Sequence, residues 1–159
     1  MKSRVLWPVL SLTVAMCFGQ HAPVVKLGDF EGESAWQGVQ PDGDDAREGQ
    51  MSGLWIPKEH NSARLERMPH DWSKYDRLCL WMYSEKANGQ RLTLVADSEN
   101  PDDDAGWDYF FYHFTVDWAG WRYLSLGFGE DIRATRRPVG FGQINYLSLN
   151  SGGWQHSPL

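Results

Sequence analysis

Hydrophobic and polar residues alternate along most of the chain after residue 24, which is the pattern of half-buried β-strands. The cleanest alternations cover residues 78–84, 91–97 and 107–116, and shorter ones cover residues 24–29, 52–57, 62–68, 122–126 and 144–149. No segment keeps an apolar period of 3.6 residues for three turns, and no internal repeat is visible. Seven or eight short strands separated by turn residues predict an all-β protein, an antiparallel β-sandwich of the jelly-roll type.

The segment 107–116 is unusual because aromatic rings occupy both of its faces. One face carries Phe110, Tyr112, Phe114 and Val116. The other carries Trp107, Tyr109, Phe111 and His113. Only one face of a sandwich strand has to enter the core, so the second set of rings is available for binding.

Turn residues between the strands predict how they connect. Asn88-Gly89 is the signal of a type I′ hairpin joining residues 78–84 to 91–97, with Leu78, Leu80 and Met82 facing inward. The corner 117–121 predicts a second antiparallel pair, between 107–116 and 122–126. The Gly- and Asp-rich stretch 38–49 reads as a loop, and 69–73 as a turn.

The first 19 residues have the composition of a secretory signal peptide. Lys2 and Arg4 precede a mostly apolar run, and Gly19 or Ala22 offers a small residue at the cleavage point. Cys17 lacks the small preceding residue of a lipoprotein signal, because Met16 stands there. We therefore expect a secreted or periplasmic protein with a single module over residues 24–159. No other segment is apolar enough to span a membrane.

Charge limits the classes of partner that we expect, and cysteine content limits the possible disulfides. The chain has 15 Lys and Arg against 21 Asp and Glu, and the signal peptide takes two of the basic residues with it. Nucleic acids and anionic membranes reward a basic surface, so neither is expected as a partner. Cys79 is the only cysteine after the signal peptide, which excludes an intramolecular disulfide, so the module has to hold together through its core.

Several motifs together resemble a known class of module. They are Asp71-Trp72-Ser73-Lys74-Tyr75-Asp76, Leu80-Trp81-Met82-Tyr83-Ser84-Glu85, the strand 109–116, Asp117-Trp118-Ala119-Gly120-Trp121 and Arg137-Pro138-Val139-Gly140-Phe141. Over residues 27–154 the chain resembles the galactose-binding-like jelly-roll carbohydrate-binding modules found ahead of alginate-lyase-like or heparinase-like catalytic domains of bacterial polysaccharide-degrading enzymes. The resemblance implies a non-catalytic module that binds a polysaccharide or oligosaccharide, with a catalytic domain in a longer parent.

The chain departs from that class at two places. Phe141 stands where such modules often have Trp, and the chain stops at Leu159, before the further strand with an acidic pair that usually closes the fold. A fragment or truncated product is the expected explanation. The first strand would then lose a partner and present an open edge.

Carbohydrate binding needs aromatic plates against the flat face of a sugar and polar groups in the plane of its ring. If residues 78–84, 91–97 and 107–116 adjoin in one sheet, their non-core faces supply both. The candidate binding residues are Trp81, Tyr83, Arg91, Asp97, Trp107, Tyr109, Phe111 and His113, with Thr93 as a further polar group. Trp154 lies at a loop edge within reach of such a ligand.

The same rings also have a purely structural interpretation. Large rings are often buried between the sheets of a sandwich, and a register shift of one residue exchanges the two faces. Trp72, Trp118 and Trp121 lie in turns beside Asp, where a ring commonly plugs the end of the core. His113 taken alone is more typical of an exposed strand residue than of a general base.

A structural calcium ion is a second candidate feature. Asp29, Glu31 and Glu48, with carbonyl groups of the 42–49 loop, offer the hard oxygen ligands that Ca²⁺ prefers. The modules that this chain resembles commonly carry such an ion, with a last carboxylate from the closing strand. The acidic run 102–104 is interpreted as a solvated loop.

Catalysis by this chain alone is not expected. Carboxylates cluster in loops and turns without a pattern that fixes an acid opposite a base, and no nucleophile elbow, zinc-ligand spacing or phosphate loop occurs. The alternative to glycan binding is a structural spacer that packs on a catalytic domain of a longer parent. In that case the Trp and Tyr side chains are covered by the neighbour and no glycan binds.

Overall fold

The protein is an antiparallel β-sandwich. The computed structural model describes residues 9–10, 15–16, 24–32 and 35–152, and every regular element within those ranges is a β-strand. The strands are β1 (Val9–Leu10), β2 (Ala15–Met16), β3 (Val25–Lys26), β4 (Trp36–Gln37), β5 (Gln40–Asp42), β6 (Ser52–Leu54), β7 (Ser62–Leu65), β8 (Arg77–Ser84), β9 (Arg91–Asp97), β10 (Tyr109–Thr115), β11 (Gly120–Gly127), β12 (Arg133–Thr135) and β13 (Tyr146–Asn150). The part of the chain that the structure describes has no helix able to cross a membrane.

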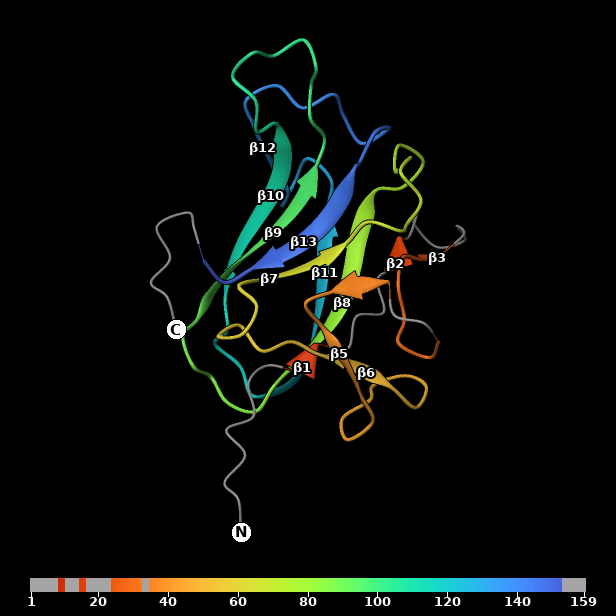
Figure 1. The fold of residues 1–159 in the computed structure, drawn as a ribbon, viewed down its shortest axis with the longest axis vertical. Coiled ribbons are helices and arrows are strands. Elements are labelled where there is room, and N and C mark those ends of the chain that lie inside the picture. Colours follow the sequence, from red (N-terminus) through yellow and green to blue (C-terminus); the bar gives the residue numbers. More distant parts are fainter. Residues whose placement is uncertain (1–8, 11–14, 17–23, 33–34, 153–159) are drawn as a thin grey trace.

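The strands form three sheets (Figure 1). A six-stranded sheet has the order β12-β10-β9-β13-β7-β4, and a four-stranded sheet has the order β11-β8-β2-β3. A small three-stranded sheet has the order β1-β6-β5. All pairs among the described strands are antiparallel, as the alternating sequence pattern predicts.

The core lies between the six-stranded and four-stranded sheets. The inward positions of β9 are Leu92, Leu94 and Ala96, and those of β8 are Leu78, Leu80 and Met82, as the alternation predicts. Trp55 and Trp72 are completely buried, and each indole Nε1 donates to a backbone carbonyl, that of His60 or of Pro69, over 2.7 Å. These bonds satisfy the one polar group that a buried tryptophan carries.

Most strands lie where the alternation predicts them, and β9 matches the expected range residue for residue. The loop prediction for residues 38–49 is wrong at Gln40–Asp42, because this segment pairs with β6 as β5. Nothing in its local sequence alternates. The pairing is decided by a tertiary partner, which overrides the loop-forming composition.

Both predicted hairpins are wrong. β8 belongs to the four-stranded sheet and β9 to the six-stranded sheet, so Asn88-Gly89 lies in a connection that crosses from one sheet to the other. The segment 117–121 likewise crosses from β10 to β11. Gly89 has a left-handed backbone, with φ of 72°, but Asn88 does not, so the predicted type I′ turn, which needs positive φ at both positions, is not formed. A dipeptide turn signal therefore decides neither the turn type nor which strands pair.

Part of the predicted signal peptide lies within the described residues. Val9–Leu10 pairs with β6, and Ala15–Met16 pairs with β8 and β3. The cleavage positions Gly19 and Ala22, and Cys17, lie outside the described residues, as do Trp154 and the end of the chain. Export and cleavage stay predictions.

Candidate functional site

The predicted binding residues are divided between the two main sheets. Tyr109, Phe111 and His113 lie on the outer face of the six-stranded sheet, whereas Trp81 and Tyr83 lie on the outer face of the four-stranded sheet. A single aromatic groove made from both sets, as expected from the supposed hairpin, is therefore wrong. The face assignments within each strand are confirmed, because Phe110, Tyr112 and Phe114 contact the core and their neighbours do not.

The middle of the six-stranded sheet's outer face is closed to solvent. Asp97 is 9% exposed and Thr93 is completely buried, although both belong to the outward set of β9. Asp97 Oδ2 accepts a hydrogen bond from Asn145 Nδ2 over 2.8 Å, and the Thr93 hydroxyl lies 2.8 Å from His113 Nδ1. Asp97 and Thr93 are therefore engaged inside the protein and are poor candidates for direct contact with a ligand.

Tyr146 lies opposite Asp97 on β13. Burial, and then the negative charge of Asp97, raise the pKa of the Tyr146 hydroxyl to about 12. The Arg64 guanidinium stacks on the same ring, with Cζ 3.6 Å from the ring centroid. Tyr146 thus remains a neutral hydrogen-bond donor at physiological pH, and its ring face is covered by Arg64.

Trp107 is the most exposed large hydrophobic side chain among the described residues, at 74%. Its backbone has a φ of 66°, a left-handed conformation that is rare for a bulky residue. Glu99 holds this conformation, because its two carboxylate oxygens accept hydrogen bonds from the backbone N–H groups of Trp107 and Asp108, each over 3.1 Å. These two hydrogen bonds therefore fix the backbone from which the exposed Trp107 ring projects, just before β10 begins.

A groove runs along the free edge of β10. β12 pairs only with residues 109–111, so no described strand pairs with the outer edge of Tyr112–Thr115. β11 is the end strand of the four-stranded sheet, and its residues line the opposite wall. The site therefore lies where the edges of the two sheets approach each other.

Two cavities make up this groove, and both are lined by Tyr112 and His113. The first, of about 290 Å³, is also lined by Phe111, Glu130, Asp131 and Arg133. The second, of about 350 Å³, is also lined by Phe114, Thr115, Asp117, Trp118, Arg122 and Leu124. We call these two cavities together the β10 groove.

Rings form one wall of the β10 groove. Phe114 stacks between Tyr112 and Trp118, with centroid distances of 5.9 Å and 6.2 Å and interplanar angles of 20° and 26°. The indole Nε1 of Trp118 is buried without a hydrogen-bond partner among the described residues. A second pair of rings, Phe111 and His113, comes from the outer face of the sheet and lines the first cavity, with ring centroids 4.9 Å apart.

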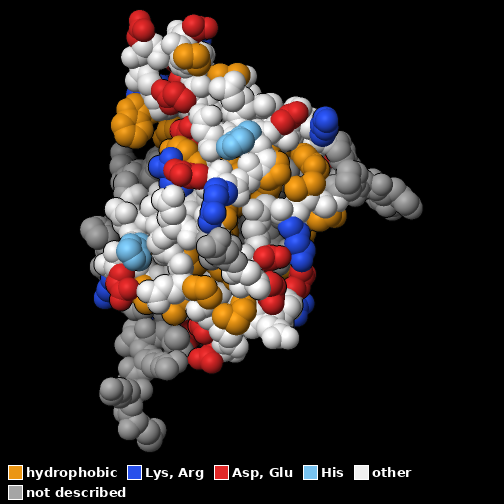
Figure 2. Space-filling model, turned by 45° about the vertical axis from the view of Figure 1, so that its right-hand side comes forward, with side chains coloured by type: hydrophobic (Ala, Val, Ile, Leu, Met, Phe, Trp, Pro, Cys, Tyr) orange, Lys and Arg blue, Asp and Glu red, His pale blue; other side chains and the backbone are white. Residues whose placement is uncertain are grey.

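Charged side chains of both signs border these rings. Arg122 forms an ion pair with Asp117, and its Cζ lies 5.0 Å from the centroid of the Trp118 ring. Arg133, Glu130 and Asp131 border the other end of the groove. Figure 2 shows the same character over the side of the molecule it displays, where small hydrophobic patches are bordered by acidic and basic side chains. Such a groove can stack on an apolar surface while donating and accepting hydrogen bonds.

The outer face of the four-stranded sheet carries a second aromatic cluster. Trp81 lies opposite Tyr123, and Tyr83 lies opposite Trp121, on the adjacent strands β8 and β11. The ring centroids are 4.9 Å apart in the first pair and 5.3 Å in the second. We call these four residues the paired-ring face. The structural interpretation placed Trp121 at the end of the core, but Trp121 belongs to this outer face.

One of the predicted calcium ligands is hydrogen-bonded to the protein backbone, and the other two are exposed. Glu31 Oε1 accepts hydrogen bonds from the backbone N–H groups of Gln50 and Met51 over 2.7 Å and 2.9 Å, and Asp29 and Glu48 are exposed. Among the described residues, no group of three or more His, Cys, Asp or Glu side chains is arranged to hold a metal ion. Calcium binding stays a prediction, and Glu31 has a structural role that the sequence did not reveal.

The sequence identified only part of the β10 groove. Phe111 and His113 were predicted, whereas the residues that complete it were not: Tyr112, Phe114, Trp118, Arg122, Glu130, Asp131 and Arg133. Tyr112 and Phe114 belong to the core-facing set and reach the groove only because β10 is close to the edge of its sheet. Arg91 is exposed at the start of β9, opposite Thr115, and does not line the groove.

Comparison of the chain with protein-family models, with curated proteins and with solved structures finds no match. The resemblance to carbohydrate-binding modules therefore keeps the status of a prediction from sequence motifs.

Proposed function

We propose that this protein is a non-catalytic carbohydrate-binding module and that the β10 groove holds the sugar. The observation that carries the proposal is the groove itself, two adjoining cavities lined by rings and bordered by charged groups of both signs at the edges of two sheets. It includes Phe111 and His113, two of the residues for which the sequence predicts sugar contact.

A sugar fits this chemistry for two reasons. The flat C–H face of a pyranose stacks on aromatic rings, and its hydroxyl groups both donate and accept hydrogen bonds. Arg122 and Arg133 supply donors, and Asp117, Glu130 and Asp131 supply acceptors. Ligand pockets commonly measure about 300–1,000 Å³, so each cavity lies near the lower end of that range. A few sugar residues of a longer chain are the expected occupant.

We expect weak binding. Covering roughly 80 Å² of apolar surface on one ring contributes about 2 kcal/mol at about 25 cal/mol per Å². Two rings and a few hydrogen bonds, less the cost of association, correspond to dissociation constants from about millimolar to tens of micromolar. That strength is sufficient for a module that keeps an enzyme near a polymer.

Affinity electrophoresis of the protein in gels containing neutral or uronic polysaccharides tests the proposal. We expect retardation by at least one polymer, and we expect Phe111→Ala to weaken it about tenfold, because one stacking ring is lost. Arg133→Ala removes a hydrogen-bond donor at the border of the groove and should also weaken binding. Circular dichroism and thermal unfolding of each variant check that its fold is intact.

Trp107→Ala is the matched control, because it removes a more exposed ring that does not line the β10 groove. Retardation that is lost in Trp107→Ala but kept in Phe111→Ala would place the sugar elsewhere. A folded protein that no polymer retards would contradict glycan binding and support the structural-spacer alternative.

A further inference from the structure

The paired-ring face is built from two cross-strand pairs in register. Because residues two apart along a strand are separated by about 7 Å, the Trp81–Tyr123 and Tyr83–Trp121 pairs form a short ladder of rings. The hydrophobic core contacts the opposite faces of β8 and β11, through Leu80, Met82 and Leu124. The core therefore does not require rings on the outer face, and Tyr123 is 46% exposed there.

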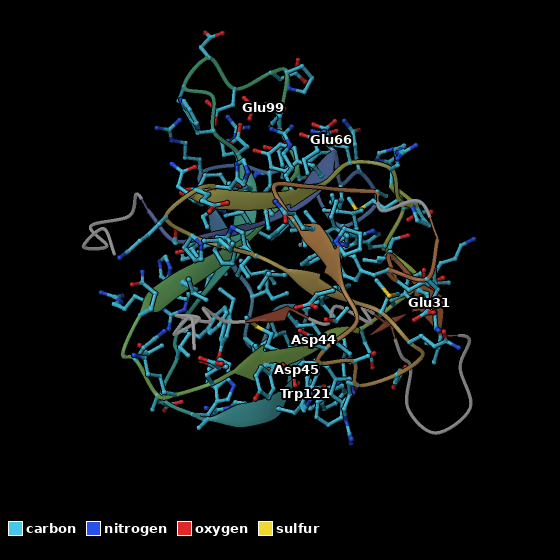
Figure 3. The ribbon with its side chains drawn as sticks, turned by 60° about the horizontal axis from the view of Figure 1, so that its bottom comes forward. Glu31, Asp44, Asp45, Glu66, Glu99 and Trp121 are labelled. Atoms are coloured by element: carbon cyan, nitrogen blue, oxygen red, sulfur yellow. The ribbon has the colours of Figure 1, made fainter. Side chains whose placement is uncertain are left out.

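A charged loop borders this ladder. The Cζ of Arg47 lies 4.5 Å from the centroid of the Trp81 ring, which brings the loop between β5 and β6 onto the paired-ring face. Figure 3 shows Asp44 and Asp45 of the same loop in the same region of the view as Trp121. Asp44 and Asp45 lie three and two residues before Arg47 in the loop whose guanidinium contacts Trp81.

We propose that the paired-ring face is a second glycan-binding surface and that it accepts an uncharged polysaccharide chain. The rings supply stacking surface for more than one sugar residue along the strands. Asp44 and Asp45 accept hydrogen bonds from hydroxyl groups, whereas they repel the carboxylates of a uronic polymer. Arg47, which stacks on Trp81, keeps its positive charge and offsets one of these two carboxylates, so these three residues together carry a net negative charge.

This surface is independent of the β10 groove. Successive residues of a strand point to opposite faces of its sheet, and β11 contributes Trp121 and Tyr123 to the paired-ring face but Arg122 and Leu124 to the groove. A protein with both surfaces binds two polysaccharide segments at once. Its apparent affinity for a polymer then exceeds that of either surface alone.

The test is affinity electrophoresis of the full chain in gels containing mixed-linkage glucan or galactomannan, which are neutral, or alginate, which is uronic. We expect Tyr123→Ala to weaken retardation by the neutral polymers about tenfold, and Tyr123→Phe, which keeps the ring, to retain it. Because Tyr123 is 46% exposed and lies outside the core, these variants should fold. The double variant Asp44→Asn/Asp45→Asn should increase retardation by alginate.

The outcomes separate the two surfaces. If Tyr123→Ala binds every polymer like the unaltered protein, the paired-ring face does not bind glycan, whatever Phe111→Ala does. If Tyr123→Ala weakens binding to neutral polymers while Phe111→Ala does not, the paired-ring face is supported and the β10 groove is not. Retardation by alginate alone, or by no polymer, would overturn the inference.

Discussion

At the scale of single residues, Trp107 combines two features that cost free energy. Its ring is 74% exposed, and its backbone has a φ of 66°. Backbone strain of this kind costs about 1–3 kcal/mol and persists only where the surroundings enforce it. Glu99 provides that enforcement through its two hydrogen bonds to the backbone of Trp107 and Asp108.

We expect Trp107→Gly to raise the free energy of unfolding by up to about 1 kcal/mol, because glycine adopts positive φ without strain. Trp107→Ala is the control, since alanine keeps the Cβ atom and hence the strain. Urea denaturation of the three proteins measures the effect. A Gly variant less stable than the Ala variant would show that the left-handed backbone at this position is not a source of strain.

Glu31 links the segment after β3 to the residues before β6 through hydrogen bonds to the backbone N–H groups of Gln50 and Met51. The backbone N–H groups of Met51 and Gln50 stabilise its charged form and hold the pKa of its carboxyl below the ordinary value of 4.5. A carboxyl with a lower pKa in the folded state contributes stability above its unfolded pKa. That contribution disappears as the pH falls through the folded value.

We expect Glu31→Gln to be less stable than the unaltered protein at pH 7 and to approach its stability as the pH falls below about 4.5. The protonated carboxyl and the amide then accept the same hydrogen bonds without charge. Denaturant unfolding at a series of pH values from 7 to 3 measures this convergence. A stability difference that stays constant over this range would exclude a role for the Glu31 charge.

At the scale of elements, pairing between strands determines which rings meet. Tyr83 and Trp121 are cross-strand partners on β8 and β11, whereas Tyr83 and Tyr109 belong to different sheets. The hairpin predicted from Asn88-Gly89 would instead have placed Tyr83 and Tyr109 on one sheet. A local turn signal describes a few residues, but the partner of each strand depends on contacts far apart in the chain.

A double-mutant cycle between Tyr83→Ala and Trp121→Ala should give a coupling energy of about 0.5–1.5 kcal/mol, as expected for a tilted ring pair. The matched cycle between Tyr83→Ala and Tyr109→Ala should give none. Thermal or urea unfolding provides the four stabilities for each cycle. Coupling in the second cycle and not the first would support the hairpin and contradict the two-sheet arrangement.

The alternating pattern predicted the β-sandwich and the inward faces of β8, β9 and β10, because a strand with one buried face has apolar residues at every second position. It predicted β9 residue for residue. The pattern did not predict short strands such as β5 and β12, since three residues are too few to show a period. Their pairing depends on contacts with segments far apart in the chain.

At the scale of the whole molecule, the candidate site arises where two sheets end. The sequence identified Phe111 and His113 as outward-facing rings, but it could not show that β10 lies near a sheet edge opposite β11. Trp118 and Arg122 therefore went unassigned as site residues, although both line the β10 groove. The sequence shows which strands carry aromatic residues. Which of these rings lie together depends on the order of the strands in the sheets, which the sequence does not show.

The most direct test of the β10 groove is a ¹H–¹⁵N nuclear magnetic resonance titration of the protein with hexasaccharides of glucan, mannan and mannuronate. We predict that at least one shifts the Trp118 indole resonance and the backbone amides of Tyr112–Thr115 together, because these groups line or adjoin the same cavity. An oligosaccharide that binds but leaves all of these resonances unchanged would contradict the account.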